Sequence, residues 1–276
     1  MSQNSVTMKK QENNLRQSEY LHTLERGLKV LNCFDHNTPS MKLSEVAKAS
    51  DLSPAVARRC LNTLIHLGYI AQHDRQFMLK PKVLELGSAF IDSMNLDTTV
   101  SPHLQALREA TGDSASLAVL SGQDILYLVH VTTNRPFRLR AGAGTRFPAH
   151  ATSLGRVILA FMPDQDIQEF LSNAPFDKLT SNTLNTRDEL SRRFKHIREK
   201  GFETAQDELD YGIISIAAPI FDKERRVVAA INCSTSTSRT DKNNIVETRI
   251  DLLRKCADEV EISLKRWPFL FQSLSH

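Results

Sequence analysis

The sequence predicts an α+β protein in which an N-terminal winged helix-turn-helix is joined by a linker helix to a second domain with a mostly antiparallel sheet. Two patterns lead to this prediction. Within residues 1–80, three helical segments precede a short β-hairpin, which is the element order of a winged helix-turn-helix. After residue 100, strand-like runs lie between helical segments, which indicates helices packed on an antiparallel sheet.

The three N-terminal helices are marked by apolar spacing and by capping residues. Residues 20–35 place leucines at steps of three and four, as a helix with one apolar face does. We expect Ser44 to cap a short second helix, and Ser53 and Pro54 to begin the third. Gly68 is suited to end that third helix, because glycine adopts the left-handed conformation common after helices.

The wing and the linker follow directly. Residues 69–71 and 76–79 are two strand-like runs around a polar turn. Residues 82–94 have the apolar spacing of a helix, and residues 95–100 are predicted to break it.

The second domain alternates helices and strands. The predicted helices are 101–111, 153–162, 164–171, 187–200 and 242–266. The predicted strands are 116–120, 125–131, 137–140, 202–205, 213–220 and 227–233.

Length and charge also divide the chain in two. A chain of 276 residues is long enough for about two domains. Residues 1–80 hold 11 Lys and Arg against 7 Asp and Glu, whereas the rest hold 24 against 25, so the N-terminal part is the one suited to a nucleic acid. We expect a disordered tail at 1–18, a DNA-binding domain at 19–80, a linker helix at 81–97 and the second domain at 98–276.

The sequence predicts a cytoplasmic protein with no membrane partner. It has no apolar run of about 18 residues and no apolar signal core at its N-terminus. Its four cysteines are widely spaced and form no CxxC pair, so we expect reduced, buried thiols.

Several stretches resemble the IclR family of bacterial transcription regulators, over about residues 20–267. They are LERGLKVLNCF, LSEVAKASDLSPAVARRCLNTLIHLGYI, GTRFPAHATSLGRVILA and DELDYGIISIAAPIFDKERRVVAAINCS. The run ARRCLNTLIHLGYI followed by RQFMLKPKVLELG is similar to a subgroup that controls aromatic-acid breakdown through the β-ketoadipate pathway. Regulators of that subgroup answer to protocatechuate, 4-hydroxybenzoate or β-ketoadipate.

The resemblance implies a GAF-like effector-binding domain, a homodimer or tetramer, and binding to palindromic double-stranded operator DNA. The subgroup favours activation over repression, which makes RNA polymerase a candidate partner. A repressor of another carboxylate-utilisation operon is the alternative within the family.

The third helix carries the residues expected to read DNA. A recognition helix lays its N-terminal half in the major groove, where arginine bonds guanine and asparagine bonds adenine. We therefore expect Arg59 and Asn62 to contact bases and Arg58 to contact a base or a phosphate, although isolated arginines are usually solvated surface charges. Ser53, Ala55 and Val56 are further candidates on this helix, and phosphate contacts are expected from Arg26, Lys42, His73 and Arg75.

The run PAHATSLGR at residues 148–156 points to a carboxylate site. A helix begins at Thr152 or Ser153, and the free N–H groups of a helix start attract anions. By family position, the effector residues are Phe147, Ser153 and Leu154 on one side, and Ser215, Asn232 and Ser234 on the other. Arg138 and Arg140 are candidate partners of the carboxylate.

Two observations leave this site open. Some family members have cysteine where Ser215 lies here, so the identity of the acid is undecided. Each serine or asparagine also has the simpler interpretation of an ordinary strand residue bonded to backbone, and Arg138 and Arg140 have that of solvated residues on an edge strand.

The sequence argues against an enzyme. It has no GxGxxG, GxxxxGK[ST], GxSxG or HExxH motif, so we expect no catalysis, no cofactor and no metal site. Cys233 near His130 or His150 is more simply a buried thiol, and the acidic stretch Asp207-Glu208-Asp210 is more simply a solvated loop than a cation site. Two other classes stay open: a small-molecule-binding enzyme with an accessory N-terminal domain, and a module whose helix-wing unit binds protein.

Overall fold

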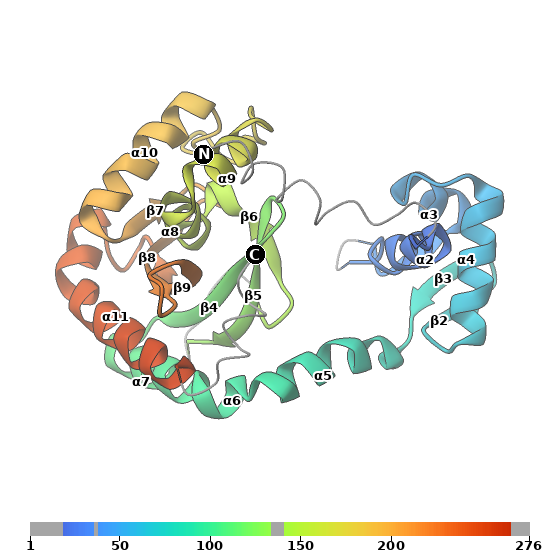
Figure 1. Ribbon diagram of the computed structural model, residues 1–276, viewed down its shortest axis with the longest axis horizontal. Helices are drawn as coiled ribbons and strands as arrows, with labels where there is room; N and C mark the ends of the chain where they lie inside the picture. Colours follow the sequence, from blue (N-terminus) through green and yellow to red (C-terminus); the bar gives the residue numbers. More distant parts are fainter. Residues whose placement is uncertain (1–18, 36–37, 134–140, 266–276) are drawn as a thin grey trace, which may run out of the picture. The chain divides into compact units, whose positions relative to one another are not determined.

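The chain forms two compact units, which divide after Phe90 in the computed structural model (Figure 1). The structure describes residues 19–35, 38–133 and 141–265. The tail predicted at 1–18 and the strand predicted at 137–140 lie outside these residues. Each unit has a sheet and a core of its own.

The first unit is a winged helix-turn-helix, as predicted. Its helices are α2 (His22–Leu31), α3 (Leu43–Ala49) and α4 (Pro54–His66). Its antiparallel sheet has the order β1-β3-β2, with β1 at Ser40–Lys42, β2 at Ile70–His73 and β3 at Gln76–Leu79. Strand β1 was not predicted, because three residues are too short to show alternation. It is fixed by tertiary pairing, in which buried Met41 lies opposite buried Phe77.

Two helix starts show how capping acts locally. Ser53 Oγ accepts from the Val56 N–H at 3.4 Å and Pro54 occupies the first turn, so α4 begins as predicted. The prediction that Ser44 caps the second helix was wrong, because α3 already begins at Leu43. The Glu45 carboxylate accepts from the Lys42 N–H at 2.6 Å and satisfies a donor at this end instead.

The segment after the wing is helical over most of its length. It contains the short 3₁₀ helix η1 (Pro81–Val83), α5 (Leu84–Met94) and α6 (Leu96–Thr99). The break predicted at 95–100 is therefore reduced to Asn95, whose φ of 46° is left-handed, and to Val100 between α6 and α7. Asparagine tolerates this conformation better than most residues, and the chain turns there and resumes a helix.

The second unit is built on a six-stranded sheet in the order β6-β5-β4-β9-β8-β7, in which every neighbouring pair is antiparallel, as the sequence predicted. Its strands are β4 (Ser114–Ser121), β5 (Asp124–Val131), β6 (Arg146–Pro148), β7 (Glu203–Gln206), β8 (Ile213–Phe221) and β9 (Val227–Ser236). Its larger helices are α7 (Ser101–Thr111), α8 (Ser153–Phe161), α9 (Asp164–Leu171), α10 (Arg187–Lys200) and α11 (Lys242–Leu264).

The sheet separates two cores, since alternate side chains point to opposite faces of a strand. Leu117, Ile231 and Cys233 belong to the core on the side of α7 and α11. Ala118, Ala217 and Ala230 belong to the core on the side of α8, α9 and α10. Both layers are visible in Figure 1. The small alanines on the second face bring α8 close to the strands that carry the predicted effector residues.

Candidate functional site

Helix α4 exposes the residues predicted to read DNA. Ala57, Leu61 and Leu64 are buried in the core of the first unit. The opposite face carries the exposed residues Ala55, Arg58, Arg59 and Asn62, while Val56 is half-buried and the Ser53 hydroxyl serves as the helix cap.

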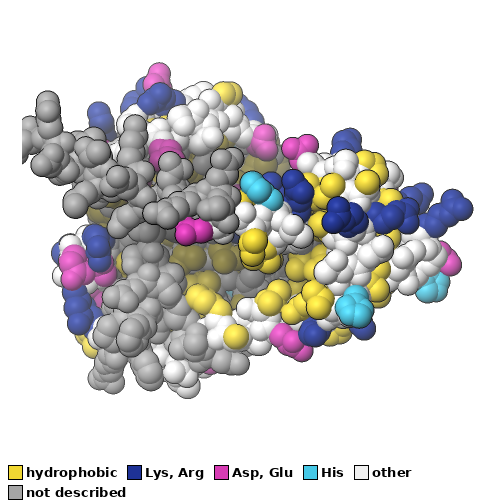
Figure 2. Space-filling model, turned by 45° about the vertical axis from the view of Figure 1, so that its right-hand side comes forward, with side chains coloured by type: hydrophobic (Ala, Val, Ile, Leu, Met, Phe, Trp, Pro, Cys, Tyr) yellow, Lys and Arg dark blue, Asp and Glu magenta, His cyan; other side chains and the backbone are white. Residues whose placement is uncertain are grey.

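The cations on this face are available for phosphates. Within the part of the chain that the structure describes, no salt bridge engages Arg58, Arg59 or Arg75. Arg75 and His73 lie at the wing turn, where His73 Nδ1 is 3.3 Å from an Asp74 carboxylate oxygen. Figure 2 shows several dark blue Lys and Arg side chains standing out from the first unit. Lys42 is exposed just before α3.

An apolar groove lies beside this face, between α2 and α4. Its volume is about 520 Å³, and Arg26 and Arg59 line it together with Leu24, Leu28 and Leu86. The leucines that made α2 look amphipathic are largely exposed, with Leu24 at 61% and Leu28 at 49%. The predicted apolar face of α2 therefore points mostly away from the core of its own unit, which is reached by Val30.

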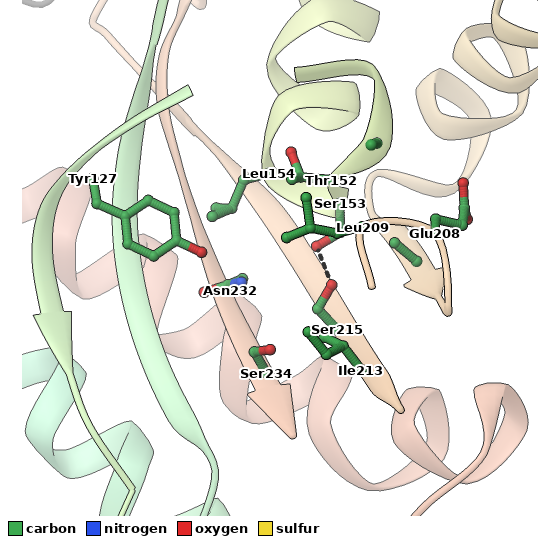
Figure 3. A pocket seen from close by; sticks show the side chains of 12 residues that line it. Tyr127, Thr152, Ser153, Leu154, Glu208, Leu209, Ile213, Ser215, Asn232 and Ser234 are labelled. Atoms are coloured by element: carbon green, nitrogen blue, oxygen red, sulfur yellow. Dashed lines mark hydrogen bonds between the residues drawn. The ribbon is translucent and has the colours of Figure 1, made fainter. Parts of the chain in front are cut away.

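The second unit holds a narrow pocket between the start of α8 and strands β5, β7, β8 and β9 (Figure 3). About 20 Å³ of it is open to the centres of water molecules, which is room for about one water. The pocket is lined by Tyr127, Ala151, Thr152, Ser153, Leu154, Ala205, Glu208, Leu209, Ile213, Ser215, Asn232 and Ser234.

The start of α8 presents backbone donors to this pocket. Thr152 Oγ1 caps the helix by accepting from the Gly155 N–H at 3.0 Å. The N–H groups of Ser153 and Leu154 belong to the first turn, so no carbonyl of the same helix can accept from them. At this end the helix dipole also favours an anion. A Cβ at Gly155 would lie 2.3 Å from the Ala149 oxygen, so glycine is needed for this turn to pack on the preceding segment.

Five of the predicted effector residues line the same pocket. Ser153 and Ser215 are hydrogen-bonded through their hydroxyls at 2.7 Å, which joins α8 to β8. Ser234 lies opposite Ser215 in the β8–β9 ladder. The other two residues are Leu154 and Asn232.

The remaining predicted effector residues lie elsewhere. The Phe147 ring is on β6 and packs edge-on against Tyr127 with 5.5 Å between ring centres, so it supports the pocket wall without lining it. Arg138 and Arg140 lie outside the described residues.

Tyr127 is a pocket residue that the sequence analysis missed. It lies in a mostly apolar strand, where nothing distinguishes it from a core aromatic residue. Burial raises the pKa of the Tyr127 hydroxyl to about 12, while hydrogen bonds from Ser116 and Asn232 oppose the shift. The hydroxyl is therefore protonated throughout the physiological pH range.

Glu208 is a second missed residue, and the prediction of a solvated acidic loop was wrong for it. Its side chain is buried and pairs with Arg156, whose guanidinium is fully buried. Arg156 Nη2 donates to Glu208 at 2.8 Å, and Arg156 Nε donates to Glu203 at 3.0 Å. Arg193 also donates to Glu203, at 2.9 Å, so two arginines balance two carboxylates.

This ion network fixes the loop between β7 and β8 that covers the pocket. Arg156 Nη1 also donates to the His150 carbonyl at 3.2 Å. Thr183 Oγ1 donates to the Glu208 carbonyl at 2.7 Å from the other side. The helix start and the loop, which form two walls of the pocket, are therefore joined through Arg156.

The structure gives no support for a thiol nucleophile. Cys233 is fully buried on the face of the sheet opposite Asn232 and Ser234, and burial raises the pKa of its thiol. Its side chain packs against α11 and not the pocket. Among residues 19–35, 38–133 and 141–265, no cluster of His, Cys, Asp and Glu could hold a metal ion. No helix in these ranges is long and apolar enough to cross a membrane.

Comparisons with known proteins agree with the fold. Residues 23–74 match the IclR helix-turn-helix domain, and residues 88–262 match the family described as bacterial transcriptional regulator IclR C-terminal. The chain is 34% identical to the Pca regulon regulatory protein of Pseudomonas putida over 85% of this chain and 81% of that protein. It is 27% identical to the p-hydroxybenzoate hydroxylase transcriptional activator of Acinetobacter baylyi, over 89% of this chain and 93% of that protein.

A solved structure of a transcriptional regulator from Rhodococcus sp. RHA1 is also similar, with 39% identity, a TM-score of 0.75, and coverage of 90% of this chain and 99% of that one. The C-terminal family match alone spans more than half of the chain. Helix α4 and all residues that line the pocket fall within the matched ranges. The chain belongs to the IclR family of bacterial transcriptional regulators.

Proposed function

We propose that this regulator activates genes of aromatic-acid catabolism when its pocket binds a small organic or aromatic acid, such as protocatechuate, 4-hydroxybenzoate or β-ketoadipate. Two relatives support the pathway, since one is named for the Pca regulon and the other for p-hydroxybenzoate hydroxylase. The motifs that resemble the β-ketoadipate subgroup support the same assignment.

The observation that carries the proposal is the composition of the pocket. The backbone donors of the α8 start suit the carboxylate, and Ser153, Ser215 and Ser234 add hydroxyl groups around it. Apolar side chains of Leu154 and Ile213 suit the remainder of the acid. The one carboxylate among the lining residues, that of Glu208, is paired with Arg156, so a site with these donors is suited to reversible binding of an acid.

The narrowness of the pocket supports a link between binding and conformation. A benzoate is several times larger than a water molecule, so it fits only if a wall moves. The loop around Glu208 and Leu209 lies between β7 and β8, outside the paired strands. Side-chain hydrogen bonds from Arg156 and Thr183 hold this wall in place. Binding would therefore favour one arrangement of the second unit over another, and that shift in population is what the DNA-binding unit would report.

We assign DNA contact to the first unit, which we take as residues 19–80, with residues 81–97 as linker and 98–276 as the effector domain. The exposed face of α4 would enter the major groove of double-stranded operator DNA, with Arg59 and Asn62 on bases. Ser53, Ala55, Val56 and Arg58 would lie along the same groove, and Arg26, Lys42, His73 and Arg75 would hold phosphates.

We also propose that the working form is a homodimer, which can pair into a tetramer. The exposed leucines of α2 and α5, among them Leu24 at 61% and Leu84 at 74%, support a second copy covering them. A dimer matches a palindromic operator, because its two recognition helices meet two half-sites. As a cytoplasmic activator, it would act on RNA polymerase at the promoter.

A mobility-shift assay with the DNA upstream of the chain's own gene tests the function, with and without each of the three acids. Calorimetric titration of the purified protein gives the affinities. We expect salt-sensitive binding to the fragment and a dissociation constant below about 1 mM for at least one acid. Absence of salt-sensitive DNA binding would exclude a regulator, and failure of all three acids to bind would exclude this effector class.

A further inference from the structure

Lys82, at the start of the linker, bonds to the C-terminal end of helix α4. Its ammonium group donates to the Leu67 carbonyl at 3.0 Å and lies 5.2 Å from the centre of the Tyr69 ring. Leu67 is the C-cap of α4, where carbonyl groups lack partners within the helix and the helix dipole attracts a cation. The end of α4 is therefore capped by a side chain from fifteen residues further along the chain.

The turn after α4 is shaped to admit this lysine. Gly68 has a φ of 83°, and a Cβ added there would lie 3.6 Å from Lys82 Cδ, so the stem of the lysine passes directly over the glycine. The Lys80 N–H donates to the Tyr69 carbonyl at 2.8 Å, which fixes the backbone just before the lysine. Lys82 is thus held both at its stem and at its ammonium group.

A second contact joins the linker to the same helix end. Leu86 of α5 lines the apolar groove between α2 and α4, together with Leu64 and Leu67. Leu86 lies four residues after Lys82, which is about one helical turn. The two compact units divide only after Phe90, so this start of the linker belongs to the first unit.

We propose that Lys82 is a positioning residue for DNA binding, which fixes the end of α4 to the linker so that the direction of the linker sets the orientation of α4 in the major groove. The inference rests on the proposed function, since it assumes that α4 enters operator DNA in a homodimer. It extends the rigid DNA-binding body past residue 80, as far as Leu86. A change in the direction of the linker then turns α4 directly.

The test measures how strictly the full-length protein distinguishes the spacing of its two half-sites, which footprinting locates in the DNA upstream of its own gene. This fragment is compared by mobility shift with one that has a base pair inserted between the half-sites. The insertion moves one half-site by about 3.4 Å along the duplex and turns it by about 34°. We expect the wild type to bind the natural spacing at least about tenfold more tightly, because α4 is held at one orientation.

Lys82→Met keeps an apolar stem of similar length but has no charge and no donor. It should still bind both fragments, and its preference for the natural spacing should be at least about threefold weaker than that of the wild type. Lys82→Arg keeps the cation and should keep the wild-type preference. Lys80→Met is the matched control, because it removes an exposed lysine of the same segment whose backbone N–H, and not its side chain, bonds to Tyr69. This control should also keep the wild-type preference.

A phosphate contact of Lys82 would give a different result. Lys82→Met would then weaken binding to both fragments equally and lower the slope of log affinity against log salt concentration by about 0.9. That result overturns the positioning role, as does an unchanged spacing preference in Lys82→Met or a wild type that binds both spacings equally. In each of these cases the proposed function stands.

A thermal melt separates positioning from folding. Lys82 is exposed, so Lys82→Met should be folded at the temperature of the binding assay. A variant that is unfolded there would show that the contact only stabilises the first unit, which overturns the positioning role. If the wild type binds neither DNA fragment, the proposed function fails and this inference fails with it.

Discussion

Helix α4 and the pocket at the start of α8 are assembled in opposite ways. The candidate DNA-reading residues come from one continuous helix, and Arg58, Arg59 and Asn62 extend from it into solvent. The pocket takes its wall from distant segments, which include the α8 start, four strands and the loop at Glu208. One region is therefore set by local rules, and the other by tertiary contacts.

This difference predicts how each region responds to substitution. A side chain on the exposed face of α4 exchanges its contacts with water, so removing it should change DNA binding and leave the fold intact. Arg156, which supports the pocket wall, bonds three other segments, namely the turn at His150, strand β7 and the loop at Glu208. Its removal should therefore lower stability before it changes recognition. The substitutions below test that contrast, from the largest expected effect to the smallest.

Replacing Arg156 by methionine should cost the most. The variant leaves Glu203 and Glu208 buried with their principal cation removed, and breaking a buried ion pair in this way costs about 3–5 kcal/mol. Urea denaturation, followed by circular dichroism, measures the free energy of unfolding.

Arg193→Met is the matched control. Its side chain is 30% exposed and Arg156 still pairs with Glu203, so its loss should be below about 2 kcal/mol. Equal losses in the two variants would contradict the central role of Arg156.

Gly155→Ala should be the next most damaging change, although it adds only a methyl group. The new Cβ would meet the backbone of Ala149 at 2.3–2.7 Å, and no flexible side chain can move aside. We expect a loss of about 1–3 kcal/mol in stability together with weaker acid binding, because the α8 start must shift. Gly87→Ala in α5 is the control, since nothing lies within 4 Å of its added Cβ. Wild-type acid affinity in Gly155→Ala would show that the position of the α8 start does not matter for binding.

The same contrast separates what the sequence predicts from what it does not. The start of α4 follows from Ser53 and Pro54, because capping depends on adjacent residues only. Asn232 and Ser234 could be placed on one face by strand alternation once the family positions were known. The pairing of Arg156 with Glu208 spans 52 residues and depends on how α8 packs over the β7–β8 loop, so neither spacing nor composition signals it.

Other misses have the same cause. Tyr127 joins the pocket only because β5 pairs with β4 and a register shift between Leu117 and Ala118 sets which residues lie opposite. Phe147 was predicted to line the pocket, but its strand β6 pairs with β5 and places the ring beside Tyr127. Strand pairing is a tertiary property, which a linear pattern constrains weakly.

Arg59→Ala tests the local region. Loss of one base contact should weaken operator binding by about 1–3 kcal/mol and relax the preference at one operator position, while stability and acid affinity stay at wild-type values. Mobility shifts on a set of single-base operator variants measure both effects. Lys255→Ala removes an exposed cation from α11 of the other unit, so it should leave operator binding unchanged. Full operator affinity in Arg59→Ala would show that this residue does not contact the operator.

The smallest expected effect is a pH dependence confined to the effector domain. Burial is the main cause that lowers the pKa of His150, and the nearby Arg156 charge adds to it, while the hydrogen bond with the Asp177 carbonyl opposes it. The folded state therefore binds this proton less readily than the unfolded state. The contribution of His150 to stability is complete above the unfolded pKa of about 6.5 and is lost as the pH falls below it, by at most about 1.4 kcal/mol per pH unit for one proton.

Urea denaturation at pH 7.5 and 5.5 measures this loss of stability. The loss should be smaller for His150→Gln, which cannot titrate, than for the wild type. His66→Gln on the exposed side of α4 is the control and should keep the wild-type loss. An identical pH dependence in His150→Gln and the wild type would show that this buried histidine does not couple the pocket region to pH.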